Sequence, residues 1–192
     1  SLASEAYRAS PIDRLILSNL AFAHARLGHF STCQDYARQA TRIDPRDAIA
    51  RNNLGACLAE DGQDLRAIGH FSLAILMDND YADPRVGRYT SFAAVRSSAV
   101  RRWIPFAWTV LSFLERRDIE AAVRLEPWNF VVRSLLANIL VAEGRLDEGL
   151  KEANESLKLG GWDTAGSQFI AGRALVLLGR HKEAVKTLES AV

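Results

Sequence analysis

The sequence predicts an all-α solenoid in which short helix pairs stack on one another, with one irregular and elongated pair in the middle. Three observations predict this fold class. Helix-ending residues recur about every 34 positions along the 192-residue chain. Between them, apolar residues recur at helical spacing. The composition, with 48% hydrophobic and 24% charged residues, is that of a globular protein and excludes disordered and collagen-like chains.

Three kinds of marker share the period. Steps of 34 residues join Pro11 to Pro45, join Ala6, Ala40 and Ala74 in turn, and join Gly28 to Gly62. After one interruption of 48 residues, steps of 34 or 35 residues resume with Ala122, Ser156 and Ala191 and with Gly144 and Gly179. A single helix pair cannot bury both of its faces, so the copies are expected to stack.

The first full copy shows why each period is expected to be a helix pair. One helical face carries Leu17, Leu20, Ala21, His24 and Leu27, and Gly28 ends that helix. The face of a second helix carries Phe30, Cys33, Ala37 and Ala40, and Asp44-Pro45 closes the unit. Later copies repeat the pattern in Leu54-Gly55, Leu58, Gly62, Ala67, Phe71 and Ala74, in Leu136-Ala137, Leu140, Gly144, Gly149 and Ala153, and in Ala171-Gly172, Leu175, Gly179, Ala184 and Leu188.

These copies resemble the tetratricopeptide repeat family. The matching residues are Asn19-Leu20-Ala21, Gly28, Tyr36-Ala37, Ala40 and Asp44-Pro45 in one copy, and Asn53-Leu54-Gly55, Gly62, Ala67, Phe71 and Ala74 in the next. The resemblance covers residues 1–81 and 120–192, and Asn79 and Gly161 stand where the family usually has proline. It implies a right-handed superhelix whose first helices line a concave groove.

The predicted organisation is a single array over residues 1–192. It comprises the second half of a truncated repeat (1–13), repeats at 14–47 and 48–81, an irregular elongated repeat (82–129), a repeat at 130–163 and a partial repeat at 164–192. Because both ends fall in second helices, we expect the chain to be cut from a longer protein or to have disordered flanks. In the irregular repeat, Asp83-Pro84 should start one helix and Pro105 should restart the second over 106–125. The 14 extra residues would lengthen each helix by about two turns.

The irregular repeat also carries a candidate secondary interface. Arg85, Arg88 and Arg96 could form one basic stripe for an anionic partner, or a solvated face opposite Glu115, Asp118 and Glu120. The apolar run 103–114, which contains Trp103 and Trp108, lies between basic pairs and could contact a membrane surface through residues 101–117. A helix buried on several sides and a partner interface built on the two tryptophans are the alternatives.

A search for chemistry is negative. The sequence contains no dinucleotide, phosphate-loop, metalloprotease or serine-hydrolase motif. His24, His29, His70 and His181 have no metal-ligand spacing, and His24 is expected to be a core residue. Cys33 and Cys57 are expected to be buried packing residues in a reducing compartment. We therefore predict no enzymatic activity, no metal and no cofactor. A net charge of +1 argues against nucleic acid as the partner.

The resemblance implies a protein or peptide partner, held in the groove by residues equivalent to the family's binding positions. These are Asn19, Phe22, Arg26, Asn52, Asn53, Asn138 and Arg173. An asparagine amide offers a donor and an acceptor to a peptide backbone, although bonds between repeats would equally use it. Leu15, Phe22, Ile49, Val131, Leu135 and Val141 suggest a partly apolar groove, which favours an apolar peptide or amphipathic helix over a charged chaperone tail.

The leading hypothesis is therefore a non-catalytic interaction scaffold or assembly adaptor. Two alternatives are a regulatory or substrate-recruiting domain of a larger enzyme, and a membrane- or nucleic-acid-associated factor that uses residues 85–114. We expect a cytoplasmic location, or a periplasmic one if a signal peptide has been removed. The oligomeric state does not follow from the sequence.

Overall fold

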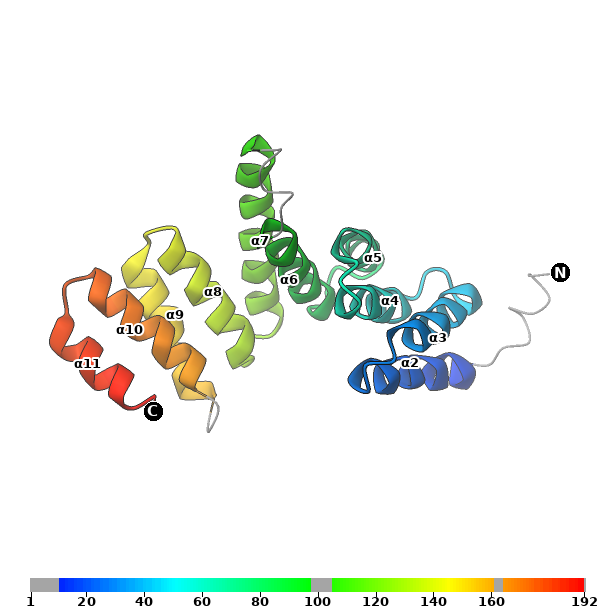
Figure 1. Ribbon diagram of the computed structural model, residues 1–192, viewed down its shortest axis with the longest axis horizontal. Coiled ribbons are helices and arrows are strands. Elements are labelled where there is room, and N and C mark those ends of the chain that lie inside the picture. Colours follow the sequence, from blue (N-terminus) through cyan, green and yellow to red (C-terminus); the bar gives the residue numbers. More distant parts are fainter. Residues whose placement is uncertain (1–10, 98–104, 161–163, 192) are drawn as a thin grey trace. The chain divides into compact units, whose positions relative to one another are not determined.

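The computed structural model describes residues 11–97, 105–160 and 164–191, and these residues form ten helices and no strand (Figure 1). In chain order the helices are α2 (Pro11–Arg26), α3 (Phe30–Ile43), α4 (Ala48–Glu60), α5 (Asp64–Met77), α6 (Asp83–Ser97), α7 (Pro105–Leu125), α8 (Phe130–Ala142), α9 (Leu146–Leu159), α10 (Ala165–Leu177) and α11 (His181–Glu189). The predicted all-α fold class is confirmed. Most of the truncated repeat predicted at residues 1–13 lies outside the described residues.

The chain divides into two compact units, residues 1–115 and 116–192, with the boundary inside α7. Within the first unit, each helix from α2 to α6 packs on the next, and α2 also contacts α4, as α4 contacts α6. Within the second unit, α8, α9, α10 and α11 pack in the same order, and α10 contacts α8. Successive helix pairs therefore stack in each unit, and the first helix of a pair contacts both helices of the pair before it. The single array predicted over the whole chain stays a prediction.

The turns inside the helix pairs depend on glycine. Gly28, Gly62, Gly144 and Gly179 all adopt positive φ, between 73° and 81°. Each lies directly after the first helix of its pair, where a left-handed residue lets the chain reverse direction. The helix ends predicted at these four glycines are confirmed.

The irregular pair consists of α6 and α7. As predicted, α6 begins at Asp83-Pro84, and α7 begins at Pro105, where proline's fixed φ suits a first helical residue. The helix α7 has 21 residues, whereas the equivalent helices α3, α5 and α9 have 14 each. This difference amounts to about two turns. Within the described residues, most of the extra helical length lies in α7, because α6 has 15 residues there and the equivalent helices α4 and α8 have 13 each.

The two cysteines of the chain are covalently bonded to each other as well as packed in the core. Cys33 in α3 and Cys57 in α4 form a disulfide bond across adjacent helix pairs. Both side chains are buried, as expected, within a core cluster that includes Ala21, Ala37 and Phe71. The prediction of two reduced packing residues was wrong, because two small-residue positions on facing helices bring their Cβ atoms within bonding reach.

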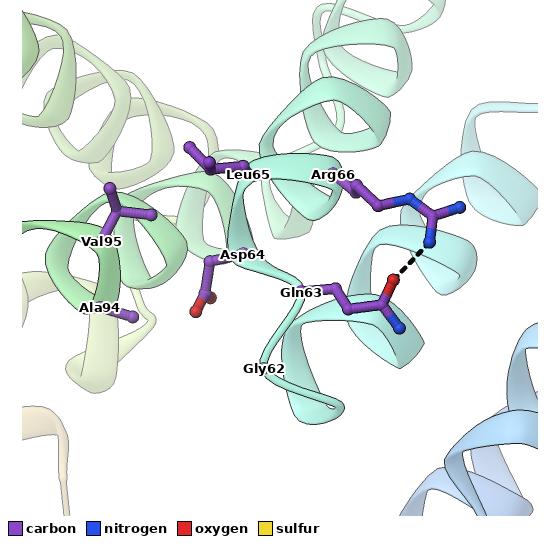
Figure 2. A pocket seen from close by; sticks show the side chains of 7 residues that line it. All are labelled: Gly62, Gln63, Asp64, Leu65, Arg66, Ala94 and Val95. Atoms are coloured by element: carbon purple, nitrogen blue, oxygen red, sulfur yellow. Dashed lines mark hydrogen bonds between the residues drawn. The ribbon is translucent and has the colours of Figure 1, made fainter. Parts of the chain in front are cut away.

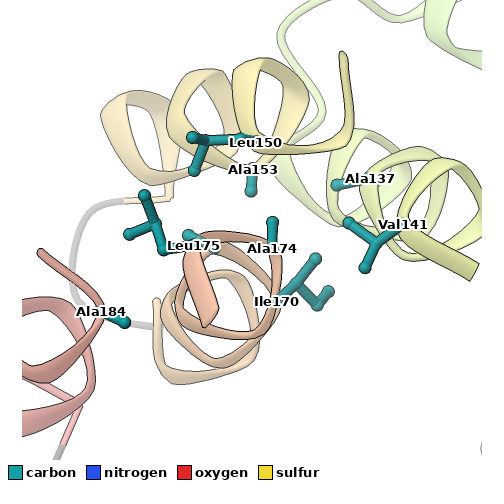
Figure 3. Packing of buried hydrophobic residues seen from close by; sticks show 9 residues of the cluster. Ala137, Val141, Leu150, Ala153, Ile170, Ala174, Leu175 and Ala184 are labelled. Carbon is teal, nitrogen blue, oxygen red and sulfur yellow. The ribbon is translucent and has the colours of Figure 1, made fainter. Parts of the chain in front are cut away.

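Each unit has its own apolar core. In the second unit, the core consists of residues from all four complete helices, and Figure 3 shows α10 between α9, α8 and α11. Its members are Ala137, Val141, Leu150, Ala153, Ile170, Ala171, Ala174, Leu175 and Ala184. Among the described helices, none combines the length and the hydropathy that a membrane span requires.

Candidate partner-binding surface

The exposed sides of α2 and α4 carry most of the predicted binding residues. Asp47 fixes the start of this surface. Its Oδ1 accepts hydrogen bonds from the backbone N–H groups of Ile49 (2.8 Å) and Ala50 (3.2 Å), which caps α4. Its Oδ2 lies 2.9 Å from Nε of Arg14 in α2. One carboxylate therefore caps α4 and also ties it to α2.

Apolar side chains stand exposed on these helices. Leu15 and Phe22 of α2 are 60% and 66% exposed, and Ile49 of α4, one period after Leu15, is 54% exposed. Asn19 is also exposed, and Asn53, one period after it, is half-buried. We call these five residues the α2/α4 face. Arg26 and Glu60 stand exposed near the C-terminal ends of the two helices.

The two asparagines on the α2/α4 face keep their hydrogen-bonding capacity. Within the described part of the chain, the side chains of Asn19 and Asn53 make no hydrogen bond. Each amide could therefore donate to a carbonyl and accept from an N–H group of a bound peptide. Bonds between repeats, the alternative use of these amides, are not seen among the described residues.

Asn52 does not belong to this surface. It is buried, and its Nδ2 donates a hydrogen bond of 3.1 Å to Oη of Tyr81. Tyr81 lies just before α6, so the bond joins one helix pair to the next. Burial, and secondly the nearby Asp83 charge, raises the pKa of the Tyr81 hydroxyl. The prediction that Asn52 contacts a partner is wrong, because one helical position turns a side chain by about 100° toward the core.

In the second unit, α8 and α10 carry the remaining predicted residues. Asn138 and Arg173 are equivalent and half-buried, and Leu135 is also half-buried. Val131, Phe169 and Leu177 are 48%, 58% and 58% exposed. Val141 was predicted to line a groove, but it is only 3% exposed because it packs against α10 in the core (Figure 3).

The predicted basic stripe on α6 is wrong. Arg85 is only 7% exposed, and its Nη2 donates to the backbone oxygen (2.8 Å) and Oδ1 (2.7 Å) of Asn79. Nη1 of Arg88 donates to Oγ of Ser72 at 3.0 Å. Nη1 of Arg96 lies 2.8 Å from Oε2 of Glu115. The three guanidinium groups therefore bind the protein itself.

Arg85 has equivalents in two other repeats, which sequence reasoning missed. Arg51 donates to the backbone oxygen of Pro45 from Nε (3.3 Å) and Nη2 (3.2 Å), and Nε of Arg133 donates to that of Pro127 at 2.8 Å. In all three cases the acceptor lies six residues before the arginine. The arginines are 34 and 48 residues apart, the same steps as the other repeat markers. This repeat spacing is the sequence feature that could have predicted a structural role for the three arginines.

The aromatic part of the secondary interface lies mostly outside the described residues. Trp103 belongs to the segment 98–104, and Trp108 lies in α7 at a position whose side chain is not described. The proposed membrane contact through residues 101–117 therefore stays a prediction. Arg116, within that range, pairs with Glu143 at 3.1 Å.

A pocket of about 310 Å³ in the first unit has no residue of the α2/α4 face in its lining, which Figure 2 shows. It is lined by the start of α5 and by Ala94 and Val95 of α6. Its Arg66 donates a hydrogen bond to Gln63, as the dashed line in Figure 2 shows. Leu65 is 68% exposed beside it. The lining residues form no acid–base pair or nucleophile arrangement.

The half-buried His70 and the buried Glu115 also have shifted pKa values, and both lie outside the candidate surface. Burial, and then the charges of Arg51, Arg66 and Arg38, lowers the pKa of His70. Burial raises the pKa of Glu115 even though Arg96 opposes the shift. Among the described residues, no three His, Cys, Asp or Glu side chains gather as metal ligands would.

Comparison with known proteins agrees with the repeat architecture. Residues 165–190 match the family model described as Tetratricopeptide repeat. A search of curated protein sequences found no match. The predicted resemblance to the tetratricopeptide repeat family is confirmed, and its fold is that of a protein-interaction scaffold.

Solved structures of MamA, a tetratricopeptide repeat protein, share this fold. A MamA structure from Desulfovibrio magneticus RS-1, covering its residues from 41 to the end, is 16% identical, with a TM-score of 0.74 and 95% of each chain covered. Another MamA crystal structure is 14% identical, with a TM-score of 0.72, and covers 93% of this chain and 90% of that one. A MamA MSR-1 structure is 19% identical, with a TM-score of 0.69 and coverage of 94% and 95%. At these identities the likeness concerns the fold alone.

Proposed function

We propose that this chain is a non-catalytic scaffold that binds a segment of a partner protein on the α2/α4 face. The observation that carries the proposal is the combination of exposed apolar side chains with unbonded amides on two helices that pack together. Leu15, Phe22 and Ile49 each expose more than half of their surface. Asn19 and Asn53 lie among them and have no hydrogen bond within the described residues.

This chemistry favours an extended or helical segment with apolar side chains. Apolar contacts would supply most of the binding free energy, since each buried large side chain contributes roughly 1.5–3 kcal/mol. The amides would fix the segment's position by bonding to its backbone. Arg26 and Glu60, which are both exposed, would contact its flanking charges. Assembly of a larger complex around the bound segment is the role that such a surface serves.

The test compares three baits in affinity capture from a lysate of the source organism, followed by a measurement of Kd with the isolated partner. Asn19→Ala combined with Asn53→Ala should weaken binding about tenfold, because two hydrogen bonds are lost. Gln39→Ala combined with Asn154→Ala is the matched control, since both amides are exposed on second helices of their pairs. Equal Kd values for all three baits would refute the proposed site.

We also propose that the chain folds in an oxidising compartment. Disulfide bonds persist in secreted and periplasmic proteins and are rare in the cytosol. The Cys33–Cys57 bond therefore supports the periplasmic alternative over the cytoplasmic location predicted from the sequence. Free thiols are alkylated in intact cells, and the protein is then analysed by mass spectrometry. Neither Cys33 nor Cys57 should carry the alkyl group, because both sulfur atoms are in the disulfide bond. Two alkylated thiols would contradict this location.

A further inference from the structure

The turn between α2 and α3 carries a histidine on each side of Gly28. His24 lies four residues before this glycine, and His29 directly follows it as the N-cap residue of α3. In the other three regular pairs, the residues equivalent to His24 are Leu58, Leu140 and Leu175, which are 1%, 4% and 5% exposed. The residues equivalent to His29 are Gln63, Arg145 and Arg180. Of these four turns, only the first therefore has two imidazole groups, and His24 is half-buried where the leucines are buried.

The two imidazole rings lie against each other. Nδ1 of His24 is 3.3 Å from Nδ1 of His29. The ring of His24 also stacks on Tyr36 of α3, with 5.4 Å between the ring centroids and 25° between the planes. The turn itself is fixed, because the amide of His29 donates to the carbonyl oxygen of His24 at 2.9 Å. Beyond their mutual contact, neither side chain makes a hydrogen bond or ion pair within the described part of the chain.

The distance between the two Nδ1 atoms suits a shared metal ion. A neutral imidazole can present a lone pair at Nδ1, and Zn²⁺ binds such a nitrogen at about 2.0–2.1 Å in tetrahedral geometry. Two ligands of a tetrahedral ion at these bond lengths are about 3.3–3.4 Å apart. At the same bond lengths, neighbouring ligands of a square-planar ion are about 2.8–3.0 Å apart. The observed 3.3 Å therefore fits the tetrahedral ion.

We propose that His24 and His29 form a zinc-binding site at the turn between α2 and α3, with Nδ1 of each ring as a ligand. Two nitrogen ligands favour Zn²⁺ over Mg²⁺ and Ca²⁺, which take oxygen ligands. Structural zinc sites have four protein ligands and catalytic sites have three. With only two here, the ion is expected to exchange with solvent and to keep two positions for water or for an oxygen ligand of a bound protein.

A zinc ion in this site would join the end of α2 to the start of α3. Because it binds the folded turn and not the unfolded chain, zinc should stabilise the protein in a concentration-dependent way. A hydrogen bond between the two rings, with the proton on one Nδ1, is the other arrangement that the same contact permits. The two arrangements differ in whether added zinc is bound at all.

The test measures zinc binding to the full chain, with its disulfide intact, by isothermal titration calorimetry with zinc chloride. His24→Leu and His29→Gln should each weaken binding at least about tenfold, because one of two ligands is lost. Both variants are expected to fold, since Leu58 and Gln63 already occupy these places in the next helix pair. Circular dichroism verifies this. His181→Ala, which removes an exposed histidine at the start of α11, is the matched control and should leave the affinity unchanged.

Two further measurements identify the ligands and the consequence for the fold. In protein labelled with ¹⁵N at histidine, zinc should shift the Nδ1 resonances of two residues, and each shift should be lost in one of the two variants. Zinc should also raise the Tm of the wild type and of His181→Ala, but not that of His24→Leu or His29→Gln. Magnesium chloride should have neither effect.

The proposal fails if zinc produces no heat and no shift at millimolar concentration, which would leave the two rings as a hydrogen-bonded pair. It also fails if either His24→Leu or His29→Gln binds zinc as tightly as the wild type. Equal weakening by His181→Ala would mean that zinc binds surface histidines without selection. The Asn19/Asn53 variant should bind zinc normally, so failure of this site is separable from failure of the α2/α4 proposal.

Discussion

At the scale of residues, the packing between the two helices of each pair follows a size rule at one pair of positions. Where the first helix has alanine, as at Ala21 and Ala137, the facing residue of the second helix is also alanine, Ala37 or Ala153, and all four are buried. Where the first helix has glycine, the facing residue is large, as in Gly55 with Phe71 and Gly172 with Leu188. Glycine on the first helix thus leaves room for a large side chain on the second, because a close-packed core has no space for both that side chain and an added Cβ atom.

Phe71 makes the tightest use of this space, because two glycines accommodate its ring. A Cβ atom at Gly55 would lie 2.8 Å from Cε1 of Phe71, and one at Gly87 would lie 2.5 Å from its Cζ. We predict that Gly87→Ala lowers the free energy of unfolding by about 1–3 kcal/mol through overpacking. Chemical denaturation followed by circular dichroism measures this change.

Two variants separate the clash from the effect of alanine on helix stability. Gly69→Ala, in an exposed position of α5 with no atom within 4 Å of the new Cβ, should raise stability by up to about 1 kcal/mol. Adding Phe71→Leu to Gly87→Ala should recover part of the loss. A Gly87→Ala variant that is as stable as Gly69→Ala would show that the ring can move away.

At the scale of elements, α6 and the long helix α7 are joined by an ion pair between the exposed Arg96 and the buried Glu115. Arg96 of α6 lies 2.8 Å from Glu115, whose side chain is 4% exposed and whose pKa is raised by burial. The folded state therefore binds a proton more tightly than the unfolded state does. Stability from this group is fully present below its ordinary, unfolded pKa of about 4.5 and is lost as pH rises through the folded pKa.

This linkage gives a prediction with a definite sign. The free energy of unfolding of the wild type, minus that of Glu115→Gln, should fall as pH rises above about 4.5, because glutamine does not ionise. Arg96→Gln removes the charge that opposes the shift and so raises the folded pKa further, and the fall should then extend to higher pH in that variant. A pH-independent difference between wild type and Glu115→Gln would contradict the raised pKa. Urea denaturation over a series of pH values supplies the measurement.

The helices were more predictable than the contacts between them. Their ends depend on local chemistry, namely glycine at positive φ and proline at the first helical position, so Gly28, Gly62 and Pro105 marked them in the sequence. Adjacent residues on a helix point in directions about 100° apart, so a shift of one position decides between core and surface. The sequence pattern therefore did not show that Asn52 is buried while Asn53 is only half-buried. Predicting the Cys33–Cys57 bond would have required knowledge of which helices face each other, and the repeat period alone does not give this.

The arginines illustrate the same difference between pattern and contact. Helical spacing placed Arg85, Arg88 and Arg96 within one sector, but their partners come from other segments: the turn at Asn79, Ser72 of α5 and Glu115 of α7. The repeat period carried better information, because Arg51, Arg85 and Arg133 occupy one structural position. Arg85→Lys is expected to destabilise the fold by about 1–3 kcal/mol, since lysine's ammonium group differs in shape and reach from the buried guanidinium group, whose Nη2 donates to two oxygen atoms of Asn79. Thermal unfolding of this variant, beside the exposed control Arg42→Lys, measures the loss.

At the scale of the whole molecule, the two units differ in how their helix pairs are held together. Each has its own buried cluster, but the covalent link joins only α3 to α4 in the first unit. A crosslink between residues 24 apart removes unfolded-state entropy worth about 3 kcal/mol. In stacked repeats each pair contacts mainly its neighbours, so this stabilisation should act locally.

Reduction of the disulfide should therefore loosen one unit and leave the other unchanged. We predict that a reducing agent, or Cys33→Ala combined with Cys57→Ala, increases amide hydrogen exchange in α2–α5 and has no effect in α8–α11. The second unit is an internal control, because it experiences the same solution conditions and contains no cysteine. Exchange read by mass spectrometry of proteolytic peptides resolves the two units. An equal rise in α8–α11 would mean that the units unfold together, and would contradict a locally acting crosslink.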